Sequence, residues 1–476
     1  MTTPVPPPAS PQRRFKALVI GSGAGGAPAA TALAEAWGEG VALLEAGPHL
    51  HARDFTQVER EMVPRLYAQG GVQGTEDGVL SLLQARTVGG STVINDALCF
   101  RPPPELDARW KALGAHIDTA ALAPFVDRVE EVLQVREIRR DQINRANYLV
   151  GLGAARLGWH GERLRHNSVG CVQCGFRHLG CAYDAKQSMN LSFVPRAQAA
   201  GAQLLPEVEV HHLERRGGAW VALTSQGAFA AEHVVLCAGV VQTPTILLRS
   251  GIAAGDGVQV HVQTVAWGDF DDPVDGFNGI PMAYGVLEFA DIYGHTGPGY
   301  LIEGVAVQPL GFSVQPQLEG LGHDEVLGRY RHLSGAVSLV RSASRGRITL
   351  KDDRPAITYP LVEADLQRLA HFYDRATELY LAAGASRVLL AHRHVGWVDR
   401  VTPVPTMDPG TFYVYTAHPF GGAGRGLVTD EVGRVPGQPG LWVLDGSAVP
   451  EAIGVNPQVT IAALALEGAA RLIADA

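Results

Sequence analysis

The sequence predicts an α/β fold, α+β overall, in which a Rossmann-type dinucleotide-binding domain, discontinuous in sequence, accompanies a second domain built on an antiparallel sheet. Three observations predict it. The apolar strand Lys16 to Ile20 runs into the glycine-rich turn Gly21 to Gly26. Strand-like segments between Gln203 and Gly239 return the chain to the same domain. Short apolar strands divided by Gly and Pro then fill the stretch from Val258 to about Tyr415.

The opening unit has the spacing of a dinucleotide-binding βαβ motif. Gly21, Gly23 and Gly26 form GxGxxG after the strand, a helical run follows from Ala29 to Ala36, and a second strand ends on Glu45. We expect Gly21 to make the tight turn, Gly23 to let a pyrophosphate approach the backbone, and Gly26 to let helix and strand pack closely. The positive end of the helix would face the phosphates, and Glu45 would accept hydrogen bonds from ribose hydroxyls. The motif predicts a dinucleotide and does not separate FAD from NAD.

The composition describes a globular protein of two or three domains. The chain has 476 residues, of which 46% are hydrophobic and 18% charged. A formal net charge of -9 argues against a nucleic-acid partner, because neutralising phosphates needs a basic face. Five cysteines do not suggest a disulfide framework at this length, so we expect a cytoplasmic protein. No apolar stretch is long enough for a membrane span, and the Pro-rich residues 1–14 are expected to be a disordered leader.

Two segments after the opening unit have simple interpretations. Arg86 to Asn95 contains Gly89, Gly90 and Ser91, a turn that could clasp more of a cofactor. Trp110 to Val135 carries apolar residues at helical spacing with charged residues on the opposite face. That spacing predicts an amphipathic packing helix.

The most unusual passage contains Cys171, Cys174 and Cys181, spaced C-x2-C-x6-C. Three thiols this close could hold iron or zinc. The ferredoxin-like position for a further ligand is occupied by Arg177, with His178 beside it. We therefore expect structural thiols in a loop near the active site rather than an iron–sulfur cluster, and we predict no metal site.

The second half of the chain contains further helix and strand signals. The strand ending on Gly239 precedes a helix that we expect to begin near Pro244, and one long helix is predicted from Glu363 to Ala383. The many apolar residues of the second domain suggest a hydrophobic pocket. They are equally compatible with the sheet's own core.

The last part of the chain carries the residues best suited to chemistry. His418 lies among small residues on a turn, a further strand ends on Asp445, and Asn456 and Pro457 open the final helix. Asn456 suits the N-cap and Pro457 the first helical position. The positive end of that helix would favour negative charge developing near Asn456.

Four blocks in this order resemble the glucose-methanol-choline (GMC) oxidoreductase family. They are the opening βαβ unit, the stretch from Arg86 to Asn95, the stretch from Ala238 to Gly251, and the closing His418 and Asn456 motifs. The resemblance implies a non-covalent FAD, because Ile94 stands where some members carry a flavin-linking His. The cofactor contacts that it implies are Gly21, Gly23, Ala24, Gly25, Gly26, Glu45, Ala46, Arg86, Gly89, Gly90, Ser91, Asn95, Val210, Ala238, Gly239, Asp445, Gly446, Asn456 and Pro457. The chain departs from the family after His418, where Ala423 to Gly426 replaces the usual C-R-M-G.

The cysteine-rich segment, with Asp184-Ala185-Lys186 after it, resembles the fatty-alcohol and sterol branch of the family. Some flavin dehydrogenases of the family carry a three-iron cluster in this segment. We expect the FAD-binding domain at residues 15–105, 190–258 and 419–476. A helical cap with the cysteine-rich loop is expected at 106–189 and a substrate-binding domain at 259–418.

The resemblance implies that His418 and Asn456 flank the flavin ring as catalytic residues. The expected reaction oxidises the CH–OH group of an apolar primary or secondary alcohol, with His418 as base and hydride transfer to flavin N5. Oxygen or an electron-transfer acceptor would regenerate the flavin. A flavin-dependent isomerase or lyase, in which His418 moves a proton, is the alternative. A nucleotide-binding sensor without catalysis is disfavoured, because a paired His and Asn at a helix N-terminus has no obvious use there.

Overall fold

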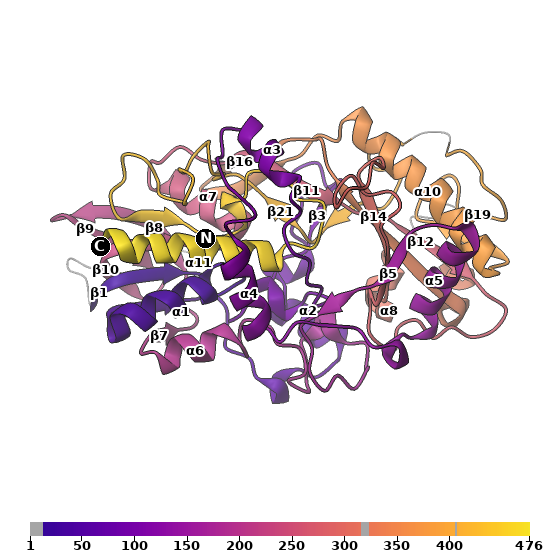
Figure 1. Ribbon diagram of the computed structural model, residues 1–476, viewed down its shortest axis with the longest axis horizontal. Helices are drawn as coiled ribbons and strands as arrows, with labels where there is room; N and C mark the ends of the chain where they lie inside the picture. The colour runs from indigo at the N-terminus through magenta and orange to yellow at the C-terminus, as the bar shows by residue number, and fades with distance from the viewer. Residues whose placement is uncertain (1–12, 316–322, 405–406) are drawn as a thin grey trace.

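The computed structural model describes residues 13–315, 323–404 and 407–476. Two parts lie side by side, each built on its own sheet (Figure 1). The predicted leader falls largely outside the described residues, and the first strand begins at Arg13. The domain boundaries given above stay predictions.

The first sheet contains strands from three distant stretches of the chain. In spatial order its parallel strands are β7 (Gln203–Leu205), β2 (Val41–Leu44), β1 (Arg13–Ile20), β10 (Gly227–Leu236) and β22 (Leu441–Val443). The first half of β10 also pairs with the antiparallel β9 (Ala219–Thr224), which pairs with β8 (Val210–Arg216). This confirms the discontinuous Rossmann-type domain.

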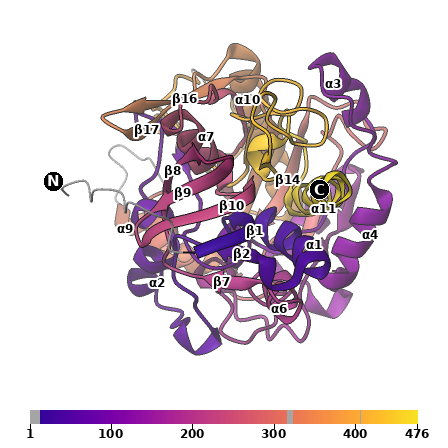
Figure 2. The ribbon, with the colours of Figure 1, turned by 90° about the vertical axis from the view of Figure 1, so that its left-hand side faces the viewer.

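Helices cover both faces of this sheet (Figure 2). On one face lie α1 (Gly26–Trp37), α6 (Phe193–Ala199) and α11 (Gln458–Asp475), and α7 (Gly239–Arg249) covers the other. The alternation of strand side chains separates the two cores. Val19 of β1 packs into the α1 and α11 core, whereas Leu18 and Ile20 pack into the core that includes Leu247 of α7.

The second sheet is mainly antiparallel, as predicted. Its longest path is β17 (Arg354–Thr358), β16 (Gly346–Lys351), β11 (Asp256–Val262), β15 (Leu333–Arg341), β12 (Val265–Asp269), β18 (Arg387–Leu390) and β19 (Trp397–Val398). Attached to it are β14 (Tyr300–Val305), β13 (Tyr284–Val286), β5 (Gly161–Arg163) and β21 (Pro419–Phe420). The helices α5 (Arg145–Leu157) and α10 (Glu363–Ala383) pack together on it, and α10 has the predicted bounds.

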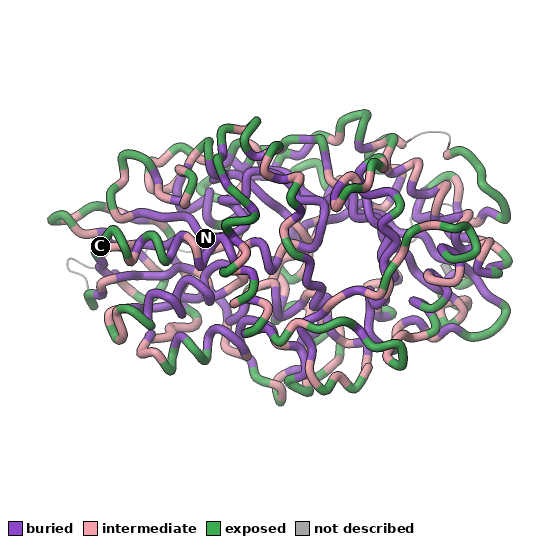
Figure 3. The backbone as a smooth tube through the Cα atoms, in the orientation of Figure 1, coloured by how far each residue is buried: buried purple, intermediate pink, exposed green. Residues whose placement is uncertain are grey.

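The remaining elements are short. They are α2 (Glu59–Leu66), α3 (Leu106–Ala112), α4 (Ala123–Val132), α8 (Pro309–Ser313), α9 (His323–Gly328), β3 (Ser81–Leu82), β4 (Arg136–Glu137), β6 (Arg165–His166) and β20 (Tyr415–Thr416). Buried backbone runs through both sheets, while exposed residues lie on the outer loops and helix faces (Figure 3). Among the helices of the described residues, none is long and apolar enough to cross a bilayer.

Three helix predictions need correction. The expected amphipathic helix over Trp110 to Val135 is divided into α3 and α4, because Gly114 takes a positive φ of 83° between them. The helix expected near Pro244 starts earlier, at Gly239, directly after the sheet. In α11 the N-cap is Pro457 and no side chain caps the helix, so Asn456 lies one position outside it.

Candidate functional site

In the glycine turn after β1, three glycines pack so closely on backbone atoms that no side chain fits at their positions. Gly21 has a φ of +96°, and a Cβ there would lie 2.2 Å from the carbonyl oxygen of Cys237. A Cβ on Gly26 would lie 1.8 Å from the oxygen of Gly21, and one on Gly25 would lie 2.0 Å from that of Leu444. The turn therefore packs directly against the ends of β10 and β22, and the start of α1 lies at the edge of the sheet.

The second glycine turn contacts the first. The Gly89 amide donates to Ser22 Oγ at 3.0 Å. A Cβ on Gly90 would lie 2.7 Å from the Cα of Gly23, so the two loops touch through glycines. The short 3₁₀ helix that begins at Gly90 follows the left-handed Gly89. The structure brings these predicted cofactor residues together.

Glu45 lies at the end of β2 with its carboxylate turned into this loop. It accepts hydrogen bonds from the Ser22 amide at 3.0 Å, Ser22 Oγ at 2.7 Å and the Gly47 amide at 2.9 Å. Burial raises the pKa of Glu45 from its usual value, against the lowering by these donors. A carboxylate has about four acceptor positions, so roughly one is left for a ribose hydroxyl.

Asp445 at the end of β22 has every acceptor position occupied by the protein. Its Oδ2 accepts from the Gly239 amide at 2.7 Å and Thr243 Oγ1 at 2.6 Å. Its Oδ1 accepts from the amide of Ser447 at 2.8 Å and from the Ser447 hydroxyl. Its side chain therefore joins the first turn of α7 to the loop after β22.

Three other predicted cofactor residues, Arg86, Val210 and Asn95, lie in different surroundings. Arg86 is exposed and its guanidinium pairs with Glu209 at 2.8 Å. Val210 packs into the core beneath the sheet. Asn95 donates to Gln458 Oε1 at 3.1 Å, which ties the second glycine loop to α11. Arg86 and Val210 are thus not brought to the glycine loops by their side chains.

His418 lies opposite His261 of β11, where a bulge changes the direction of the chain. The His261 amide donates to the His418 carbonyl at 3.1 Å, and the Gln263 amide donates to that of Tyr415 at 2.9 Å. Three steps on one side therefore face two on the other, which is a β-bulge. The amide of Ala417 in the bulge donates to Gln263 Oε1 at 3.0 Å. The bulge leaves His418 partly exposed while its neighbours are held in place.

The imidazole of His418 is neutral in this environment. Its Nδ1 lies 3.1 Å from Nδ1 of His261, and the two rings are perpendicular. Burial lowers the pKa of His418 to about 4, although the Asp96 carboxylate acts in the opposite direction.

Asn456 precedes α11 and carries a buried oxygen without a partner. The residue is 6% exposed, and its Oδ1 forms no hydrogen bond with the described residues. Thr460 Oγ1, in the first turn of α11, is likewise buried and without a partner in that part of the chain. Such groups are costly unless something satisfies them, so this end of the helix is suited to a bound polar group.

Glu303 of β14 is an acidic residue in the interior that the sequence reasoning did not select. It is 0% exposed, and neither carboxylate oxygen forms a hydrogen bond of good geometry within the described residues. Burial and then the charge of Asp96 raise its pKa to about 8, although the nearby Asn456 side chain lowers it. A carboxyl poised near neutral pH beside Asn456 is a candidate for proton transfer.

Comparison with known families decides the class of the protein. Models of the N-terminal and C-terminal parts of the GMC oxidoreductases match residues 63–265 and 342–465, more than half of the chain together. The chain belongs to the GMC oxidoreductase family. It is therefore an oxidoreductase, and the cofactor of this family is FAD.

Relatives and solved structures agree with this assignment. An uncharacterised GMC-type oxidoreductase of Mycobacterium tuberculosis is 29% identical over 491 residues, covering 97% of this chain and 76% of the relative. A long-chain-alcohol oxidase of Arabidopsis thaliana is 26% identical over 496 residues, covering 94% and 66%. The crystal structure of pyridoxine 4-oxidase from Mesorbium loti superposes with a TM-score of 0.71 at 17% identity, covering 96% and 99%. That likeness shows a shared fold.

The residues of this GMC oxidoreductase fit an FAD molecule. Small, partly exposed residues lie on the loops at the end of the first sheet: Gly21, Gly23, Ala24, Ala46, Gly90, Ser91, Ala238 and Gly239. They leave the backbone open to a pyrophosphate next to the N-terminus of α1. The unpartnered Asn456 Oδ1 and Thr460 Oγ1 lie at the N-terminal end of α11 and suit the polar edge of a flavin.

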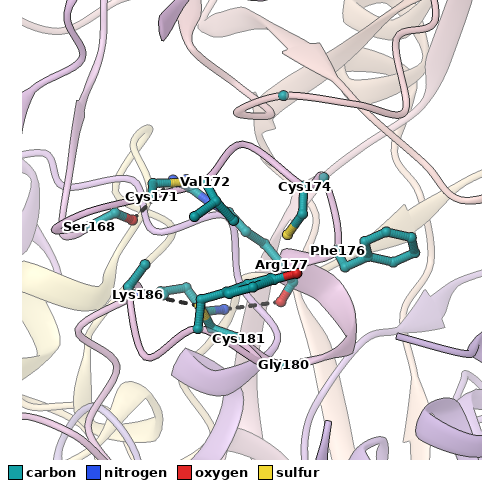
Figure 4. A pocket seen from close by; sticks show the side chains of 13 residues that line it. Ser168, Cys171, Val172, Cys174, Phe176, Arg177, Gly180, Cys181 and Lys186 are labelled. Carbon is teal, nitrogen blue, oxygen red and sulfur yellow. Dashed lines mark hydrogen bonds between the residues drawn. The ribbon is translucent and has the colours of Figure 1, made fainter. Parts of the chain in front are cut away.

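The three clustered cysteines of the GMC oxidoreductase line a small pocket (Figure 4). Each sulfur has a different donor: Arg177 contacts Cys171 Sγ at 3.7 Å, Gln57 contacts Cys174 Sγ at 3.8 Å, and the Lys186 amide contacts Cys181 Sγ at 3.4 Å. Arg177 and Lys186 line the same pocket and are buried, and burial lowers the pKa of Lys186 to about 7. Among the described residues, no group of three or more His, Cys, Asp or Glu is placed to hold a metal ion. Nothing here supports an iron–sulfur cluster.

The sequence reasoning missed two residues, His261 of β11 and Glu303 of β14, because both lie far from His418 and Asn456 along the chain. The segment from Gln259 to Gln263 alternates polar and apolar residues, yet its polar members are as buried as its apolar ones. Glu303 is a lone acid in an apolar strand. A polar residue on a strand whose two faces are both covered is the signal that could have found them.

Proposed function

We propose that this GMC oxidoreductase uses non-covalent FAD to oxidise the CH–OH group of an apolar primary or secondary alcohol, at His418 and Asn456. The observation that supports the proposal most is a partly exposed, neutral His418 that His261 links to the Gly454 turn, two residues before Asn456. The buried Asn456 Oδ1 has no hydrogen-bond partner among the described residues. Such an arrangement suits an oxygen that must be held and a proton that must move.

Each residue has a defined task in this proposal. When bound, FAD supplies the acceptor for the hydride that leaves the alcohol carbon. Asn456 holds the substrate oxygen, and the positive end of α11 stabilises negative charge that develops near it. Two titratable groups can handle the hydroxyl proton: His418, which the sequence suggests, and Glu303, which the structure adds.

Support for an apolar substrate comes from the relatives and the surroundings. Several relatives of this chain are long-chain-alcohol oxidases of Arabidopsis thaliana. The second sheet contributes a largely apolar core next to the His418 region. Non-covalent binding is supported by Ile94, a buried residue that offers no nucleophile for linkage. Oxygen or an electron-transfer partner as acceptor, and a cytoplasmic location, stay predictions.

The proposal is tested by mixing the flavin-loaded enzyme anaerobically with long-chain, aromatic and sterol alcohols. We expect bleaching of the oxidised flavin with stoichiometric carbonyl product. Peroxide release under air, compared with reduction of an artificial dye, then identifies the acceptor class. Substrate conversion while the flavin stays oxidised would contradict the proposal and favour the isomerase or lyase alternative.

A further inference from the structure

We propose that His261 is a positioning residue that holds His418 in the tautomer with its proton on Nε2. The two residues face each other across adjacent strand segments, where the His261 amide donates to the His418 carbonyl. Their Nδ1 atoms are 3.1 Å apart, a distance that requires one to donate and the other to accept.

The partner of the other ring nitrogen of His261 determines which of the two histidines donates the hydrogen bond. The Gly454 amide donates to His261 Nε2 at 2.9 Å. A backbone N–H can only donate, so Nε2 of His261 must carry a lone pair. A neutral imidazole has one N–H, which places the His261 proton on Nδ1. His261 is 0% exposed, and burial with the charge of His418 and Arg341 lowers its pKa well below the ordinary value, which keeps it neutral.

The tautomer of His418 follows from that of His261. Because Nδ1 of His418 accepts the hydrogen bond from His261, its own proton lies on Nε2. Protonating His418 would bring two N–H groups face to face at this contact, so the pair resists a charged His418. The opposing influence is the Asp96 carboxylate, which favours the charged form. Glu303 is the other acid of this region, and Asp96 acts on it as well.

The same strand joins His418 to Asn456. β11 binds the loop before α11 through two polar side chains, because Gln259 Oε1 accepts from the Ala452 amide at 3.1 Å and His261 accepts from Gly454. Gly454 has a φ of +82° and lies two residues before Asn456. His261 therefore fixes both the protonation pattern of His418 and the turn that leads to Asn456.

This inference rests on the proposed function for its chemical meaning. An Nε2–H group donates a hydrogen bond to the alcohol oxygen and stabilises its developing negative charge. The same nitrogen has no lone pair with which to take the hydroxyl proton. Glu303, next to Asn456, is the second titratable group of the site, with a pKa raised by burial to about 8. In its ionised form the Glu303 carboxylate takes that proton, so the O–H bond of the alcohol breaks and an O–H bond forms on Glu303. The role of base expected for His418 from sequence is thereby reassigned.

Nuclear magnetic resonance of the holoenzyme with ¹⁵N-labelled histidine tests the tautomer directly. Comparison with His418→Gln identifies the His418 signals, and His371→Gln serves as a control in a histidine that bonds Tyr300 elsewhere. We expect His418 to show a protonated Nε2 and an accepting Nδ1. A proton on Nδ1 of His418 with a free Nε2 would overturn the proposal, whatever the variants do.

Two variants of His261 distinguish control of the His418 tautomer from support of the Gly454 turn. His261→Gln keeps an acceptor for Gly454 and removes the donor to His418, while His261→Asn keeps a donor near His418 and loses the acceptor. We expect His418 in the Gln variant to lose its single tautomer and to gain an upward pKa shift, with flavin reduction slowed at least about tenfold. The Asn variant should stay closer to the wild type in both readouts. An unchanged His418 spectrum in the Gln variant would show that His261 only supports the Gly454 turn.

Failure of this inference and failure of the proposed function are distinguishable. The tautomer is read without any alcohol present. An enzyme with the predicted tautomer that no alcohol reduces would contradict the proposed function alone. An enzyme that alcohols reduce, with His418 protonated on Nδ1, would contradict the role of His261 alone.

Discussion

The glycine loops and the cluster of His261, Glu303, His418 and Asn456 both contain buried polar side chains. Only at the glycine loops do neighbouring amides and hydroxyls donate hydrogen bonds to the buried carboxylates. Asp445 and Glu45 accept short hydrogen bonds from nearby amides and hydroxyls. Glu303 and Asn456 are equally buried, and their oxygens have no partner in the described ranges.

This difference in hydrogen bonding indicates a structural role for the glycine-loop acids and a chemical role for Glu303 and Asn456. The hydrogen-bonded carboxylates of Glu45 and Asp445 join the loops at the cofactor end, and their substitution should damage folding or flavin binding. Unsatisfied polar atoms are an energetic cost to the folded protein, retained where a ligand or a proton will meet them. Substitutions in the two regions should therefore have different effects.

The largest effect is expected from Gly26→Ala at the glycine loop. The new Cβ would collide with the Gly21 carbonyl oxygen, 1.8 Å away, so the turn cannot keep its geometry. We expect a loss of on the order of 3–5 kcal/mol in unfolding free energy, with loss of bound flavin. Thermal melts and flavin content measure it. Gly328→Ala, at a helix position where nothing lies within 4 Å of a Cβ, is the control and should behave like the wild type.

Substitution of His418 should slow flavin reduction without loss of bound flavin. In His418→Gln we expect flavin to be retained and anaerobic flavin reduction to slow by about 10²–10⁴-fold, because the hydrogen bond to the substrate oxygen is lost. Stopped-flow absorbance measures the rate. The His371→Gln control should reduce at the wild-type rate. Unchanged reduction in His418→Gln would remove this residue from the reaction.

Glu303→Gln should change the pH dependence of stability. The pKa of Glu303 is raised by burial to about 8 from an ordinary value of 4.5. A raised folded-state pKa gives stability that is fully present below pH 4.5 and is lost as the pH rises through 8. Removing the acid removes that loss, so Glu303→Gln should melt at a higher temperature than the wild type above pH 8. Melting curves from pH 5 to pH 9 of flavin-free protein measure it, and parallel curves would contradict the assignment.

The smallest effect is expected at the cysteine-rich loop. Cys171→Ser keeps a small polar side chain that can accept from Arg177, so unfolding free energy should change by less than about 0.5 kcal/mol. The flavin spectrum should be unchanged. Metal analysis checks the same point: iron bound in the wild type and lost in Cys171→Ser would show that these thiols ligate a metal after all.

The sequence predicted features that depend on local contacts better than features that depend on contacts between distant parts of the chain. The glycine loops, Glu45 and α10 are local patterns with strong backbone requirements, and they lie where the sequence placed them. The strand expected to end on Asp445 is β22, which ends two residues earlier at Val443. The helix starts at α7 and α11 were misplaced because tertiary packing sets where a helix begins more than local Pro and Asn residues do.

His261 and Glu303 show what local patterns omit. Both belong to the second sheet, and they reach His418 and Asn456 only through the fold. A bulge of one residue turns His418 toward this cluster, and no sequence signal for that bulge stands out. Arg86 stays a predicted cofactor contact, and in this structure its guanidinium pairs with Glu209 at the surface.

The central claim is that a bound flavin accepts hydride from an alcohol held at His418 and Asn456. Anaerobic stopped-flow reduction with a long-chain alcohol, protiated or deuterated at the carbinol carbon, tests it most directly. We expect flavin bleaching in a single turnover that is slower with deuterium at that carbon. A flavin that stays oxidised while the alcohol is consumed, or purified protein without flavin, would contradict the account.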